Sequence, residues 1–109
     1  MSEDTDTPVL DLLARMTADS IEASSLDDKQ LMLVRIAALV ATDAPAASYF
    51  LNLGAAGEVD VEADEIRGVL AAIAPIVGTP RVVAASGNIM RAIDVAIDLA
   101  ELESEATQP

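Results

Sequence analysis

The chain has 109 residues, the usual size of one domain, and 52% of them are hydrophobic. Nineteen acidic residues stand against six basic ones, giving a formal net charge of −13, which argues against nucleic acid and anionic membranes as partners. Cysteine and histidine are both absent, so the sequence excludes thiol chemistry, the usual zinc sites and a Ser-His-Asp triad.

No segment reaches the about 18 to 20 uninterrupted apolar residues of a membrane span, and the longest apolar run, 31–40, is interrupted by Arg35. The acidic start of the chain, residues 1–7, lacks the basic and apolar parts of a secretory signal. We therefore expect a soluble, cytoplasmic protein, with no membrane partner and no metal or cofactor.

The first predicted helix begins with Thr7 as N-cap and Pro8 at the first helical position, where a missing N–H costs nothing. Four apolar residues then follow at the i, i+3, i+4, i+7 spacing of one helix face, namely Val9, Leu12, Leu13 and Met16. We expect this helix to continue to Ala23. Residues 1–6 before it are predicted to be a disordered acidic N-terminus.

The second predicted helix, residues 28–41, is apolar nearly all round. It follows the acidic pair Asp27 and Asp28, which suits the positive end of a helix dipole. A helix without a polar face has to be covered on several sides, and a chain this short can hardly cover it alone. The sequence therefore predicts a homo-oligomer.

The third predicted helix starts with Asp43 as N-cap and Pro45 in its first turn. It runs through Leu53, after which Gly54 and Gly57 are expected to loosen it.

The fourth helix starts in the acid-rich segment 62–66. Its predicted apolar stripe consists of Ile66, Val69, Leu70, Ile73 and Ile76. Pro75 should kink or end this helix, and Gly78 should stop it.

The last predicted helix starts with the same residue pair as the first one, with Thr79 as N-cap and Pro80 as its first residue. Its predicted stripe is Val82, Ser86, Ile89, Ile93, Ala96, Ile97 and Ala100. Residues 104–109 are expected to be a disordered tail. No strand-like alternation occurs, so the prediction is an all-α fold of five helices in one domain, residues 7–103.

Four features together carry a resemblance to a known family. They are the helix start 26–29 with its apolar helix, a helix ending at 55–57, the acid-rich start 62–66, and the segment 74–81, Ala-Pro-Ile-Val-Gly-Thr-Pro-Arg. In this order the chain resembles the carboxymuconolactone decarboxylase family, small helical proteins that include the alkyl hydroperoxidase D-like peroxidases. The resemblance covers residues 25–98 and implies that helical fold.

The peroxidase branch of that family carries two cysteines and a histidine on the helix before the acid-rich start. The resemblance places them at Pro45, Ser48 and Asn52 of this chain. None of these side chains supplies a thiolate or shuttles a proton in that way, and the whole chain lacks cysteine, so thiol peroxidase activity is excluded.

The decarboxylase branch needs no thiol, and the resemblance would imply a lactone-acid substrate and release of carbon dioxide. Without histidine, general acid-base work needs a perturbed Asp, Glu, Lys or Tyr, and Tyr49 and Glu65 are the candidates near the family's site. The alternative assigns Tyr49 to the core or an interface and Glu65 to a helix start.

Arg35 is the third catalytic or clamping candidate, because a cation within an apolar helix is costly unless it is paired. The planar guanidinium of Arg35 can bind the carboxylate of an organic acid or, alternatively, a carboxylate of the protein. Further hydrogen bonds to the same ligand are predicted from Ser48, Asn52, Arg81 and Arg91.

Two functions remain open on the sequence. One is a non-thiol decarboxylase or lyase acting on a small organic acid or lactone. The other is a non-catalytic homo-oligomer that binds a small ligand or a protein.

Overall fold

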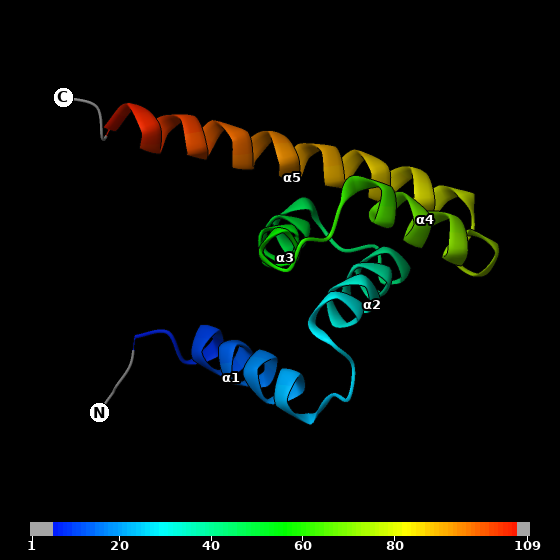
Figure 1. The fold of residues 1–109 in the computed structure, drawn as a ribbon, viewed down its shortest axis with the longest axis horizontal. Helices are drawn as coiled ribbons and strands as arrows, with labels where there is room; N and C mark the ends of the chain where they lie inside the picture. The colour runs from blue at the N-terminus through cyan, green and yellow to red at the C-terminus, as the bar shows by residue number, and fades with distance from the viewer. Residues whose placement is uncertain (1–5, 107–109) are drawn as a thin grey trace.

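The computed structural model describes residues 6–106, which form five α-helices and no strand (Figure 1). The helices are α1 Pro8–Ala23, α2 Asp28–Ala41, α3 Ala46–Glu58, α4 Ala63–Val77 and α5 Thr79–Ala106. The predicted all-α class is confirmed. The predictions for residues 1–5 and 107–109 lie outside the described residues, and α5 runs to Ala106, into the segment for which a tail was predicted from Ser104.

Local capping explains where α1 and α2 begin. Pro8 is the first residue of α1, as predicted, although the Thr7 hydroxyl donates to the Asp11 carboxylate at 3.3 Å and does not cap the backbone. At α2, Asp27 accepts from the Gln30 N–H at 2.8 Å and the Gln30 side chain accepts from the Asp27 N–H at 3.3 Å. This reciprocal capping box satisfies two amides that the helix start leaves open.

The predicted start of α3 is wrong. Its N-cap is Pro45, and Asp43 takes a left-handed backbone conformation with φ 55° in the turn that ends α2. Aspartate is compatible with both roles, since it caps helices and also tolerates positive φ. The helix then continues through Gly54 and Gly57 to Glu58, because its packing outweighs the weak helix propensity of glycine.

A single residue separates α4 from α5. Pro75 lies inside α4, which continues to Val77 and ends at Gly78 with φ 88°, a conformation that glycine adopts without steric cost. The next helix begins directly at Thr79, so Thr79 is its first residue and not the predicted N-cap. This tight link folds α5 back along α4 (Figure 1).

The core consists of two clusters on α2. Near the carboxyl end of α2, Val40 packs with Ala44, Tyr49 and three residues of α5, which are Ala85, Ile89 and Ala92. Near its amino end a second cluster is formed by Leu31, Met32, Ile36 and Ala56. Leu53 and Ile66 lie against both clusters and join them, so α2 to α5 form one packed body.

The predicted stripe of α4 is correct except at its end. Ile66, Val69, Leu70 and Ile73 are partly buried and pack against the two clusters. Ile76 is 86% exposed.

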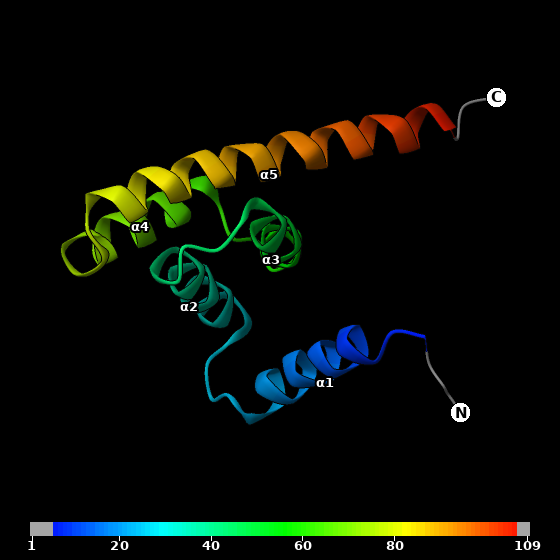
Figure 2. The ribbon, with the colours of Figure 1, turned by 180° about the vertical axis from the view of Figure 1, so that it is seen from behind.

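Helix α1 lies beside α2 and apart from α5 in both views of the ribbon (Figures 1 and 2). None of its residues is buried. Its predicted apolar stripe does form, but the stripe is open, with Val9 66%, Leu12 48%, Leu13 49% and Met16 56% exposed.

Helix α5 extends beyond the packed body (Figure 1). All described side chains after Ala92 are exposed, including the large apolar side chains of Ile93, Val95, Ile97, Leu99 and Leu102. Within residues 6–106, no helix has the length and apolarity that crossing a membrane requires.

The contribution of α2 to the core is tested by a pair of identical substitutions. Ile36 is fully buried and Ile76 is 86% exposed. We expect Ile36→Ala to reduce the free energy of unfolding by about 2 to 5 kcal/mol, because it leaves a cavity. Ile76→Ala should change it by less than about 0.5 kcal/mol. Urea denaturation followed by circular dichroism measures both, and equal losses would contradict the assigned core.

Candidate functional site

Glu65 holds the start of α4 against the start of α2. One carboxylate oxygen accepts from the Glu62 N–H at 2.9 Å, and the other lies 3.2 Å from the Lys29 ammonium. The backbone hydrogen bond from Glu62, followed by the hydrogen bond from Lys29, lowers the pKa of Glu65 below its ordinary value. Glu65 is therefore ionised and engaged in a helix cap near neutral pH.

Tyr49 is a core residue of α3, only 1% exposed. Burial, and secondarily the charge of Asp43, raise the pKa of its phenol. No hydrogen bond within residues 6–106 reaches its hydroxyl.

These two candidates lie at opposite ends of α2. Tyr49 packs beside Val40, whereas Glu65 pairs with Lys29. At 1.5 Å per residue, Lys29 and Val40 are about 16 Å apart along the helix axis. Tyr49 and Glu65 therefore contact opposite ends of α2.

Arg35 lies half-buried between α2 and α1. Its Nη2 donates to the Ser20 hydroxyl at 3.1 Å and, at 3.4 Å, to the carbonyl oxygen of Thr17. Both acceptors are neutral, and Arg35 forms no ion pair with any acid among residues 6–106. Its guanidinium thus ties α1 to α2 while keeping its charge uncompensated by the described residues.

The remaining candidates do not converge on Arg35. Ser48 and Asn52 are one turn apart on α3, where the Asn52 amide donates to the Ser48 carbonyl at 2.9 Å. On α5, Arg91 donates to the Asn88 side-chain oxygen at 2.7 Å, and Asn88 donates to the Ala44 carbonyl at 3.3 Å.

Arg81 is exposed near the start of α5, almost three turns before Arg91. The structure therefore brings Ser48 close to Asn52 but leaves the three arginine candidates on separate parts of the surface.

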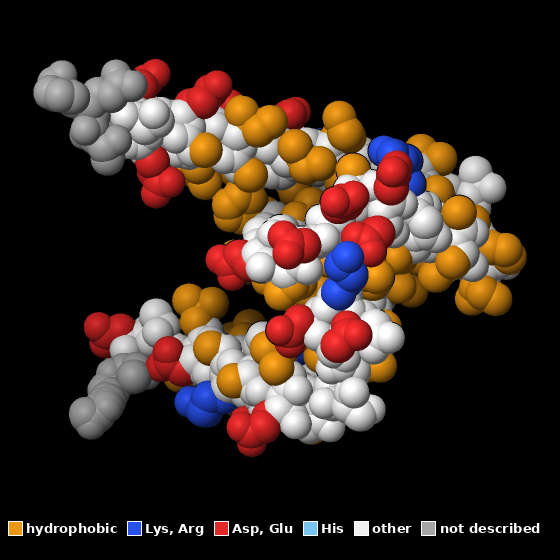
Figure 3. Space-filling view, viewed as in Figure 1, with side chains coloured by type: hydrophobic (Ala, Val, Ile, Leu, Met, Phe, Trp, Pro, Cys, Tyr) orange, Lys and Arg blue, Asp and Glu red, His pale blue; other side chains and the backbone are white. Residues whose placement is uncertain are grey.

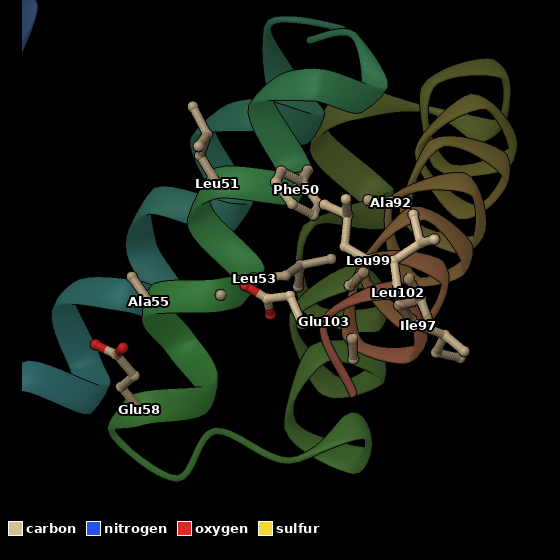
Figure 4. Close-up of a pocket in the computed structure, with 14 residues that line it drawn as sticks. Phe50, Leu51, Leu53, Ala55, Glu58, Ala92, Ile97, Leu99, Leu102 and Glu103 are labelled. Carbon is tan, nitrogen blue, oxygen red and sulfur yellow. The ribbon is translucent and has the colours of Figure 1, made fainter. Parts of the chain in front are cut away.

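An open, apolar groove with a volume of about 830 Å³ lies between α3 and the C-terminal half of α5. Phe50 and Leu53 project into it from α3 (Figure 4). On the α5 side it is lined by Ala92, Ile93, Ala96, Ile97, Leu99, Ala100, Leu102 and Glu103. Glu58 and Glu103 are its charged residues, so it suits an apolar occupant.

Arg91 lines a second, smaller hollow of about 280 Å³ near the start of α3. Arg35, Ser48 and Asn52 line neither of these two hollows.

The predicted stripe of the last helix is wrong in most positions, because the buried residues of α5 are Ala85, Ile89 and Ala92, and only Ile89 belongs to that stripe. Ser86 is exposed, and Ile93, Ala96, Ile97 and Ala100 line the groove, which sequence reasoning missed. The periodicity shows which residues share a face, yet it does not show that α3 crosses α5 and covers only part of it (Figure 1). The available signal was length: α5 has 28 residues, about 42 Å, so a single crossing helix leaves some of its apolar side chains uncovered.

Comparison with known proteins fits this helical arrangement. The model of the carboxymuconolactone decarboxylase family matches residues 7–87, which is most of the chain. The protein belongs to the carboxymuconolactone decarboxylase family. Comparisons with curated proteins and with solved structures found no match. The described part of the chain also holds no group of three acidic side chains placed to bind a metal ion.

The cap at Glu65 predicts a specific pH dependence. Because the folded pKa lies below the ordinary value of 4.5, the carboxylate stabilises the fold at pH 7, and this contribution is lost as pH falls below 4.5 through the folded pKa. Glu65→Gln keeps an acceptor for the Glu62 N–H but loses the charge. It should unfold at a lower temperature than wild type at pH 7, with a difference that shrinks toward pH 3.

Thermal unfolding between pH 7 and pH 3 measures that difference. Glu101→Gln is the matched control, since it removes the same charge from an exposed position on α5, away from the cap. A difference between wild type and Glu65→Gln that stays constant with pH would contradict the assigned interaction.

Proposed function

We propose that this member of the carboxymuconolactone decarboxylase family is a non-catalytic, homo-oligomeric binding module. The observation that carries the proposal is the large apolar surface left open on α1 and along the groove between α3 and α5. Its binding partner is a protein surface of the same apolar kind.

The titratable groups favour binding over catalysis. Efficient proton transfer needs a group with a pKa near the working pH, and the family's thiol and imidazole are absent. The two shifted groups move away from neutrality, Glu65 downward and Tyr49 upward. Each therefore becomes a poorer proton-transfer group at pH 7.

The exposed area supports self-association. The chain exposes 7412 Å², against about 5,700 Å² expected for a folded monomer of 11.3 kDa. Its radius of gyration is 15.9 Å, where a compact chain of this length has about 13 Å. Most of the large exposed apolar side chains belong to α1 and α5. Surfaces of this kind mark interaction sites.

The oligomer is tested by light scattering at micromolar concentration. We expect the wild-type mass to be a multiple of 11.3 kDa. Leu99→Asp places a charge in the groove and should shift the mass toward the monomer. Ile76→Asp, at an exposed position on α4, should leave the mass unchanged. A monomeric wild type would refute the proposal.

A small organic acid is the second candidate ligand, favoured by the charge of Arg35. Its guanidinium contacts only neutral acceptors among the described residues and so retains its capacity to bind a carboxylate. This candidate also keeps open the decarboxylase or lyase function, in which Arg35 would hold the substrate.

Thermal shift against a set of small carboxylic acids and lactones tests this candidate. We expect an acid that raises the melting temperature of wild type to have no effect on Arg35→Ala. Ser20→Ala is the matched control, because it removes one hydrogen-bond partner of Arg35 but keeps the cation. Equal shifts in wild type and Arg35→Ala would exclude Arg35 as the ligand site.

A further inference from the structure

We propose that α1 of one copy lies in the groove between α3 and α5 of a second copy, and that the second copy returns the same contact. This inference rests on the proposed self-association and specifies its two surfaces. It pairs two apolar features that the chain leaves open, the stripe on α1 and the groove.

The stripe on α1 has the pattern of a helix that binds in a groove. Val9, Leu12, Leu13 and Met16 occupy positions i, i+3, i+4 and i+7, the anchor spacing of helices that dock into apolar grooves. All four are at least 48% exposed. An isolated helix of 16 residues is only marginally stable in water, so α1 needs a surface against which to pack.

The attachment of α1 leaves this stripe accessible. Ser20, which binds Arg35, is four residues after Met16 and hence on the same helix face. The face that meets α2 at the end of α1 therefore continues toward Val9 beyond the packed body. In the space-filling view, hydrophobic side chains along α1 and along the outer part of α5 border a hollow (Figure 3).

The length of the groove and the small side chains along its walls allow it to hold such a helix. Its α5 wall from Ala92 to Glu103 is about 16 Å long, and the stripe from Val9 to Met16 is about 10 Å long. Three small residues at four-residue spacing, Ala92, Ala96 and Ala100, lie along this wall, and Gly54 lies on the opposite one. Small side chains let a second helix approach closely, with its leucines filling the space between α3 and α5.

Charge favours α1 over a second α5 as the occupant. After Arg91 the sequence has no basic residue, and the outer part of α5 carries the acids Asp94, Asp98, Glu101, Glu103 and Glu105. Two such segments side by side would bring like charges together. In contrast, α1 carries Arg15 against three acids, Asp11, Asp19 and Glu22, so it is less negative than the outer part of a second α5. Its Arg15 complements Glu58 and Glu103 at the groove.

The exposed area of the chain is large enough for a dimer with two-fold symmetry. A reciprocal contact buries both apolar surfaces of each copy and leaves no open end, as a two-fold axis requires. The exposed area exceeds that of a compact monomer by about 1,700 Å². Stable homodimers bury about 1,000 to 2,500 Å² on each partner, so the excess is sufficient for such an interface.

Cysteine cross-linking tests the contact directly, because the chain has no cysteine of its own. Leu13→Cys, on the α1 stripe, and Ala96→Cys, in the groove, are prepared as separate chains, unfolded together, refolded and mildly oxidised. We expect a disulfide-linked pair of two chains, several-fold more abundant than in either variant alone. Leu13→Cys mixed with Ile76→Cys is the matched control, and all three positions are exposed, so the variants should fold.

Two results would overturn this inference while leaving the proposed function intact. One is an oligomer by light scattering that yields no more disulfide than the control mixture. The other is a chain carrying both cysteines that forms its disulfide within one chain, which would show α1 folding into its own groove. A monomeric wild type in the same light-scattering measurement would instead refute the proposed function.

Discussion

The structure depends on the burial of one helix. Ile36 and Val40 of α2 are fully buried, and each belongs to one of the two clusters that hold α3, α4 and α5 together. A helix with so little polar surface gains most of its stability from tertiary packing, and the neighbours compete to cover it. In this chain α3, α4 and α5 cover one side of α2, while Val34 on the other side stays 56% exposed. Most of the open apolar surface lies elsewhere, on α1 and on the part of α5 beyond the core, where no helix of the same chain covers it.

Local signals predicted most of the helices because they act within a few residues. Pro8 fixes the start of α1, Asp27 with Gln30 fixes that of α2, and Gly78 ends α4. The start of α3 was mispredicted, because a turn at Asp43 and a cap at Asp43 have the same local sequence. What the sequence could not show is which stripes meet, since that depends on the lengths and crossing of helices far apart in the chain.

The candidate site illustrates the same limit. Residue chemistry selected Arg35, Tyr49 and Glu65 as site candidates, and each has a distinct environment in the fold. Their separation along α2 could not be read from spacing, because Tyr49 and Glu65 reach that helix from two other helices. The groove was missed for a complementary reason: its lining is mostly apolar, and apolar residues at helical spacing are normally assigned to a core.

The point where the core ends on α5 makes the groove sensitive to the curvature of one helix. Ala85, Ile89 and Ala92 hold the first half of α5 in the core, and all described side chains after Ala92 are exposed. Ala100 in the groove lies eight residues beyond Ala92, about 12 Å along the helix axis. A bend of about 15° at Ala92 would move Ala100 by about 3 Å, so the width of the groove depends on the stiffness of a helix arm that no core contact supports.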